Sequence, residues 1–195
     1  MSGLLTGEQI DAVWQGPFAW NGYEHGNGLP PLPKLSGVYL FAVPYRNGYA
    51  VQGAGETKDT VARFKGHKRK FMCGEYTVLD IDALGRGIRK EVWHGWGWTE
   101  QKRIEYARRK PEIDQAAQKE LAGLRIFVAD VGLEQRIRQR LEAKVMDLLY
   151  QQSPPLCDLP DKGVFLARRR SPEKPITVTS ISTVKLYGIP EKFEI

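Results

Sequence analysis

Residues 37–52 read GVYLFAVPYRNGYAVQ, and this stretch decides the fold of the 195-residue chain. Its first half, 37–43, is rich in β-branched, aromatic and apolar residues, which is typical of a buried strand. Asn47-Gly48 tolerates the positive φ angles of a tight hairpin turn. Residues 49–52 can then return beside the first strand. We therefore predict a β-hairpin from Gly37 to about Ala54.

Helices and further strands are expected on the C-terminal side of this hairpin. Capping side chains precede a short helix over residues 60–70. A charged, exposed helix is expected over 99–121, where Pro111 can interrupt it. Apolar residues spaced four apart from Leu133 to Leu149 predict an amphipathic core helix. Further strands are predicted over residues 76–81, 125–129, 164–167 and 176–186. This order predicts an α/β (α+β) fold, a small mixed or antiparallel sheet flanked by helices.

The chain is long enough for one compact domain with extensions, and too short for two comfortable domains. Glycine and proline crowd residues 21–33 and argue against regular structure there. We therefore expect an N-terminal extension over 1–36, the main domain over 37–160, and C-terminal strands with a tail over 161–195.

Composition narrows the class of protein. Hydrophobic residues make up 42% and charged residues 27% of the chain, as in ordinary globular proteins. The net charge of +6 favours a polyanionic partner. No apolar run approaches the ~18 residues of a membrane span, and Met1 to Ile10 lacks the pattern of a secretory signal. Cys73 and Cys157 have no Cys or His at metal-ligand spacing, so a cytoplasmic location is expected.

Short motifs between residues 37 and 158 resemble the GIY-YIG nuclease superfamily, which includes homing endonucleases, excision-repair incision subunits and some restriction enzymes. Gly37-Val38-Tyr39 stands where the family has Gly-Ile-Tyr, and Gly53-Ala54-Gly55 stands where it has Tyr-Ile-Gly. Two positions depart from the family pattern. Gly53 occupies the place of the second tyrosine, and Cys157 stands where asparagine is usual.

The same resemblance supplies a candidate active site. Arg63 and His67 fall on the first helix where the family has arginine and often histidine or tyrosine, and Glu142 resembles its metal-binding glutamate. The resemblance implies a GIY-YIG-like nuclease domain that hydrolyses phosphodiester bonds of nucleic acid, DNA being expected. Glu142 would hold Mg²⁺ or Mn²⁺, Arg63 and His67 would bind the phosphate, and Tyr39 would orient water. The basic residues expected to contact nucleic acid are Lys65, Lys68, Arg69 and Lys70.

Elementary chemistry agrees with these roles. Mg²⁺ keeps several waters, so a single carboxylate can anchor it. The guanidinium of Arg63 can bind two phosphate oxygens at once. Tyrosine ionises near pH ~10, so Tyr39 suits positioning better than deprotonation. If the strand is bulged or its register shifts, Tyr49 could supply the missing second phenol.

Each candidate also has an ordinary structural explanation. Glu142 can be a solvated carboxylate paired with Arg138, and His67 a surface residue of a basic helix. Tyr39 can be a core residue whose hydroxyl is satisfied. The chain could then be a degenerate GIY-YIG domain that binds nucleic acid without cutting it, or a protein-interaction domain. A homodimer or a targeting partner protein is also open, and Trp93, Trp96 and Trp98 could stack on bases or pack over the sheet.

Overall fold

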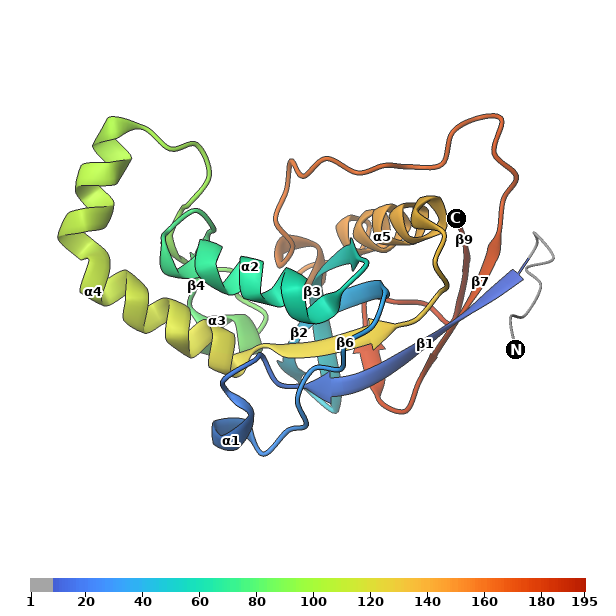
Figure 1. Cartoon of the computed structure of the whole chain (residues 1–195), viewed down its shortest axis with the longest axis horizontal. Coiled ribbons are helices and arrows are strands. Elements are labelled where there is room, and N and C mark those ends of the chain that lie inside the picture. The colour runs from blue at the N-terminus through green and yellow to red at the C-terminus, as the bar shows by residue number, and fades with distance from the viewer. Residues whose placement is uncertain (1–8) are drawn as a thin grey trace.

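The computed structural model describes residues 9–195 and confirms a mixed α+β fold (Figure 1). The strands are β1 (Gln9–Phe18), β2 (Gly37–Tyr45), β3 (Gly48–Thr57), β4 (Val78–Leu79), β5 (Glu91–Trp93), β6 (Arg125–Ala129), β7 (Thr177–Ser182), β8 (Lys185–Tyr187) and β9 (Lys192–Glu194). The helices are α1 (Glu24–Asn27), α2 (Thr60–Met72), α3 (Ile81–Gly85), α4 (Glu100–Gly123), α5 (Gln135–Tyr150) and the 3₁₀ turn η1 (Leu156–Asp158). The main sheet has the order β8-β3-β2-β6-β1-β7-β9, and β4 pairs with β5 apart from it.

The predicted hairpin is confirmed as the antiparallel pair β2 and β3. Tyr45 pairs with Gly48, so the loop is Arg46-Asn47, and Arg46 rather than the glycine takes a positive φ of 50°. The register shifts between Phe41 and Ala42, which leaves Gln52 without a partner across the pair. A bulge of this kind re-aims the side chain that it carries.

Alternating residues of β2 bury against opposite faces of the sheet, as the period of a strand requires. Val38, Leu40 and Ala42 belong to the core that α5 covers. Tyr39 and Val43 belong to the second core, which includes residues of α2 and of the C-terminal half of α4. The hairpin therefore carries both cores of the protein.

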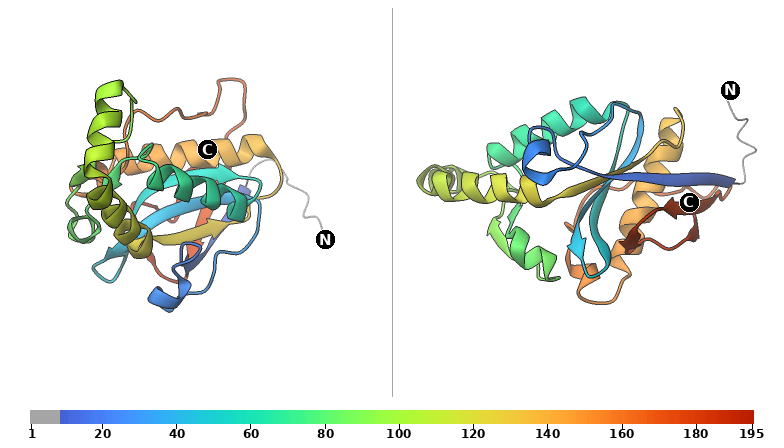
Figure 2. Two further views of the ribbon diagram at one scale, coloured as in Figure 1. Left: turned by 60° about the vertical axis from the view of Figure 1, so that its left-hand side comes forward. Right: turned by 90° about the horizontal axis from the view of Figure 1, so that it is seen from below.

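The N-terminal segment contributes a strand that the sequence analysis placed outside the main domain. β1 lies between β6, antiparallel to it, and β7, parallel to it (Figure 2, right). Its alternate residues Ile10, Ala12 and Trp14 are buried in the core under α5. This alternation is a strand pattern, and the Gly- and Pro-rich stretch that follows β1 hid it. Residues 1–8, where most of the segment searched for a secretory signal lies, are outside the described residues.

The helix predictions are confirmed with one refinement. α4 begins after its capping residue Thr99 and runs through Pro111 without ending, although it bends midway in Figure 1. Proline commonly causes such a bend. All the buried residues of α4 follow the proline, so only its first half is the exposed helix that the charge pattern predicted. Of the helices between residues 9 and 195, none has the length and apolar character needed to cross a membrane.

The strand predictions differ in outcome. Residues 125–129 form β6, and the segment 176–186 splits into β7 and β8. The strand expected over 76–81 shrinks to β4. The strand predicted over 164–167 is wrong, since these residues run as irregular chain whose Phe165 is 94% exposed. Apolar character there serves to cover a cavity rather than to pair in a sheet.

Two neighbouring glycines of β3 give a test of this packing. A Cβ atom at Gly55 would overlap the Tyr39 phenol, whereas a Cβ at Gly53 would meet nothing closer than Phe41 Cδ2 at 3.8 Å. We expect Gly55→Ala to lower the free energy of unfolding by about 1–3 kcal/mol through overpacking. Gly53→Ala should change it by less than about 0.5 kcal/mol. Urea denaturation of both variants measures this, and equal losses would contradict the packing of Tyr39 described here.

Candidate active site

A cavity of about 290 Å³ lies where α2 and α5 approach the outer edge of β3. β8 pairs only with Gly48 to Ala50, so the rest of this edge has no strand partner among residues 9–195. Side chains from α2 and α5, which cover opposite faces of the sheet, can therefore meet around the edge. Residues 164–166 form part of the cavity wall. Tyr39, Arg63, His67 and Glu142, the candidates from the sequence, all line this one cavity.

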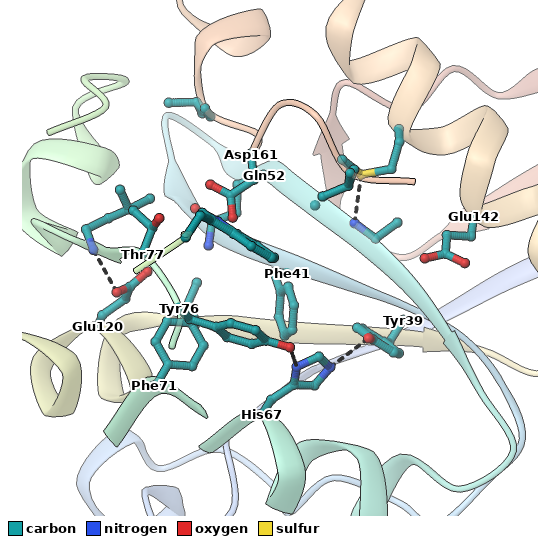
Figure 3. Close-up of a pocket in the computed structure, with 18 of the residues that line it drawn as sticks. Tyr39, Phe41, Gln52, His67, Phe71, Tyr76, Thr77, Glu120, Glu142 and Asp161 are labelled. Carbon is teal, nitrogen blue, oxygen red and sulfur yellow. Dashed lines mark hydrogen bonds between the residues drawn. The ribbon is translucent and has the colours of Figure 1, made fainter. Parts of the chain in front are cut away.

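The hydroxyl of Tyr39 is the centre of a buried hydrogen-bond network (Figure 3). Tyr39 Oη and His67 Nε2 are 2.8 Å apart, and Arg63 Nε donates to Tyr39 Oη over 3.2 Å. Tyr39 is 2% exposed and His67 6%, whereas Arg63 reaches the solvent. The expectation that Tyr39 has a satisfied core hydroxyl is confirmed, and the alternative of His67 as a surface residue is wrong.

A second phenol joins the network from Tyr76, which the sequence analysis expected in a strand and to which it gave no role at the site. Tyr76 Oη lies 3.0 Å from His67 Nδ1 (Figure 3). The suggested substitute, Tyr49, instead packs on Phe127 in the core under α5, with ring centroids 5.1 Å apart. A neutral imidazole has one donor and one acceptor nitrogen, so the two phenols hold opposite hydrogen-bond roles toward His67.

Burial keeps Tyr39 and His67 uncharged at neutral pH. Desolvation, reinforced by the charges of Arg63 and Lys70, lowers the pKa of His67 to about 3. Desolvation also raises the pKa of Tyr39 to about 12, although the neighbouring Arg63 charge opposes it. Tyr39 is therefore a phenol rather than a phenolate, in agreement with a positioning role. Both nitrogens of His67 are engaged, so His67 orients the two tyrosines.

Glu142 projects from α5 toward the cavity on the other side of the β3 edge (Figure 3). Among the described residues it makes no ion pair and no hydrogen bond. Desolvation and the nearby charge of Glu56 raise its pKa to about 7, with Arg63 acting in the opposite direction. The expected pairing with Arg138 is wrong, because the fully buried Arg138 pairs with Glu56 over 3.1 Å. Glu142 thus presents a carboxylate that is available to a ligand.

This carboxylate fits a hard divalent cation. Carboxylate oxygens suit Mg²⁺ and Mn²⁺, and a second carboxylate, Glu56, adds negative charge nearby. Within residues 9–195 no group of three or more His, Cys, Asp or Glu side chains is placed to share a metal ion. An ion at Glu142 would accordingly complete its coordination with water and phosphate oxygens, as Mg²⁺ commonly does.

The four basic residues expected to contact nucleic acid fall into two pairs. Lys65 and Arg69 are exposed and form no ion pair with any described residue. Lys68 donates to the Asn21 carbonyl over 3.3 Å and lies over the Tyr23 ring. Lys70 pairs with Glu75 at 3.9 Å and lies over the Tyr76 ring. Lys65 and Arg69 therefore remain the better candidates for phosphate contacts.

The three tryptophans of residues 93–98 differ in their exposure and in whether they line the cavity. Trp93 is buried and donates to the Gly74 carbonyl over 2.8 Å, so packing explains it. Trp96 is 46% exposed, lines the cavity and stacks on Tyr76 with ring centroids 5.8 Å apart. Trp98 lies against Trp93. Only Trp96 keeps both a free face and a place in the cavity.

Several cavity residues carry no motif that sequence reasoning could find. Gln52 is exposed to the cavity by the bulge in β3, and Thr77 precedes the short strand β4. Glu120 lies in the apolar stripe Ile113, Ala117 and Leu121 of α4, and that spacing was the one available signal that this carboxyl is buried. Cys157, in the position of the usual asparagine, does not line the cavity.

No protein-family model, curated protein or solved structure matches this chain. The GIY-YIG relationship therefore stays a prediction, and the function has to be argued from the cavity and its side chains.

The Tyr39 network predicts a specific cost for removing one oxygen atom. Tyr39→Phe leaves the buried Nε2 atom of His67 without a partner and removes the acceptor of Arg63 Nε, so the free energy of unfolding should fall by about 1–3 kcal/mol. Tyr49→Phe is the matched control, since the Tyr49 hydroxyl makes no side-chain hydrogen bond to the described residues. It should cost less than about 0.5 kcal/mol. Chemical denaturation compares the two variants, and an unchanged free energy of unfolding in Tyr39→Phe would rule out the network.

The raised pKa of Glu142 predicts a pH-dependent stability difference. Because folding raises this pKa from about 4.5 to about 7, its stabilising contribution is full below pH 4.5 and is lost as the pH rises through 7. Glu142→Gln does not ionise and so does not lose this contribution. Between pH 5 and pH 8 the free energy of unfolding of the variant should therefore rise relative to that of wild type by on the order of 1–3 kcal/mol. Denaturation at several pH values without divalent metal measures it. A constant difference would show that Glu142 is ordinarily solvated.

Proposed function

We propose that this protein is a divalent-metal-dependent endonuclease of the GIY-YIG type that hydrolyses phosphodiester bonds, with DNA as the expected substrate. One observation carries the proposal. Tyr39 of β2, Arg63 of α2 and Glu142 of α5 line a single cavity at an open sheet edge. These are the residues that the family resemblance selected, and they offer a phenol, a guanidinium and an unpaired carboxylate to one ligand.

Each side chain has a role that its surroundings allow. The guanidinium of Arg63 is exposed and can bind phosphate oxygens where negative charge develops. The neutral phenol of Tyr39, held by His67 and Arg63, can orient a water molecule for attack. A Mg²⁺ or Mn²⁺ ion held by Glu142 would supply Lewis-acid activation of that water and neutralise phosphate charge. Lys65 and Arg69 add exposed positive charge elsewhere on α2.

The decisive experiment is nicking of supercoiled plasmid at low salt with Mg²⁺ and with Mn²⁺. Glu142→Ala should abolish cleavage, Arg63→Ala should lower its rate at least about 100-fold, and EDTA should stop it. The matched controls Glu191→Ala and Arg108→Ala remove exposed charges that do not line the cavity and should leave the rate unchanged. Cleavage that survives in both site variants would contradict the proposed site.

A non-cutting domain is the second candidate, and Gly53 favours it because the family's second tyrosine is missing. In that case plasmid would be retained in a gel shift but not nicked, and retention would weaken steeply with salt. A protein-interaction domain is the third candidate. The first half of α4, where Ile104 is 64% exposed, would then be its surface, and neither cleavage nor retention would occur. A homodimer or a targeting partner stays a prediction under each candidate.

A further inference from the structure

The cavity has a second polar group, away from Tyr39 and Glu142, formed by Gln52, Thr77 and Glu120 (Figure 3). Thr77 is 4% exposed, and its Oγ1 atom is buried without a hydrogen-bond partner among residues 9–195. The Gln52 Oε1 atom is likewise buried without a hydrogen-bond partner among these residues. Glu120 is 2% exposed and accepts one hydrogen bond, from the Leu79 amide over 2.8 Å.

Buried polar atoms without partners are costly, at about 1–3 kcal/mol each. Proteins retain few of them, and each one calls for an explanation. Two such atoms and a buried carboxyl come from three separate elements and line one cavity. Their hydrogen bonds are therefore available to a ligand that enters it.

Aromatic side chains form much of the remaining wall. Phe41, Phe71, Tyr76 and Trp96 line the same cavity, and Trp96 and Tyr76 are stacked with an angle of 28° between their planes. Flat apolar faces beside a few hydrogen-bonding groups are what an unpaired base needs, since its faces stack and its edge makes hydrogen bonds. The volume of about 290 Å³ is just below the roughly 300–1,000 Å³ typical of small-ligand pockets, which suits a ligand as small as a single base.

We propose that this cavity binds one unpaired nucleobase of a nucleic-acid strand, with the base edge at Gln52, Thr77 and Glu120. The base stacks on the free face of Trp96, and its phosphate extends toward Arg63. This inference rests on the proposed function for the phosphate end only. A base within a duplex could enter the cavity only by leaving its stack, which costs roughly a few kcal/mol. The cost is smallest for a base that is mismatched or already single-stranded. The protein should therefore prefer single strands, mismatches and loops.

The donors and acceptors suit a base edge. The Thr77 hydroxyl and the Gln52 amide can each donate and accept. Desolvation raises the pKa of Glu120 to about 8, with Asp161 acting in the same direction and Arg89 in the opposite one. At pH 7 the Glu120 carboxyl is therefore mostly protonated and can donate a hydrogen bond to a ring nitrogen or carbonyl oxygen of the base.

The first test compares the four deoxynucleoside 5′-monophosphates with deoxyribose 5-phosphate by calorimetric titration of the full chain. At least one base should raise the affinity tenfold or more over the sugar phosphate. Thr77→Val, which keeps the side-chain shape, should remove most of this gain without changing the affinity for deoxyribose 5-phosphate. Thr177→Val, in β7, is the matched control and should bind like wild type. No gain from any base, or an equal gain in Thr77→Val, overturns the proposal.

A second variant keeps the test independent of Thr77. In wild type the increase in affinity that the base provides should fall above pH 8, because Glu120 ionises and stops donating a hydrogen bond. In Glu120→Gln, whose amide donates at every pH, this increase should stay constant. The same pH profile in both proteins would overturn the assignment of Glu120.

Two further arms separate this inference from the nuclease itself. An unstructured deoxyoligonucleotide should displace the bound mononucleotide, and failure to do so would make a free nucleotide the ligand and overturn the proposal. If nicking depends on Glu142 and Arg63 but no base raises the affinity over deoxyribose 5-phosphate, the proposed nuclease is supported and the base site is overturned. If a base raises the affinity, the oligonucleotide displaces the mononucleotide and the protein does not nick DNA, the base site is supported and the proposed nuclease activity is overturned.

Discussion

The structure depends on one buried hydroxyl, that of Tyr39, which joins the central hairpin to helix α2. It bonds to His67 and accepts from Arg63, so the helix has one register in which all three groups are satisfied. Gly55 is the condition for this arrangement, because any side chain there would overlap the phenol. A strand rich in apolar residues thus carries one polar group into the core and uses it to fix the position of an exposed arginine.

Two carboxyl groups in the cavity gain distinct properties from their surroundings. Burial raises the pKa of Glu120 to about 8 and that of Glu142 to about 7. The first is fully enclosed and held neutral, where it can donate a hydrogen bond. The second titrates at physiological pH, so a cation that binds it also completes its ionisation. The buried guanidinium of Arg138 pairs with Glu56 of β3 and not with Glu142. The pairing therefore leaves one carboxylate without an internal partner.

The sequence was informative where local pattern and tertiary packing agree. The apolar run and turn of residues 37–52 predicted the hairpin, and the resemblance to the GIY-YIG motifs brought Arg63 and Glu142 into the candidate site. It was uninformative where long-range pairing decides the outcome. β1 has the alternation of a strand, but its pairing with β6 on one side and β7 on the other is long-range, and no local pattern predicts it. Gln52 and Glu120 line the cavity through a bulge and a helix face, which motifs do not encode.

Gly53, which stands where the GIY-YIG motif has a second tyrosine, bears on two features of the structure. Tyr76, from a separate segment, supplies a second phenol to the histidine that holds Tyr39, so the network does not depend on residue 53. Gly53 itself lines the cavity, and a Cβ atom there would have only Phe41 nearby, at 3.8 Å. A larger side chain at this position would extend beside Phe41 and take up space in the cavity. Glycine therefore removes a phenol from the strand and leaves room for a ligand, and the same residue that weakens the match to a nuclease motif enlarges the site where a base would bind.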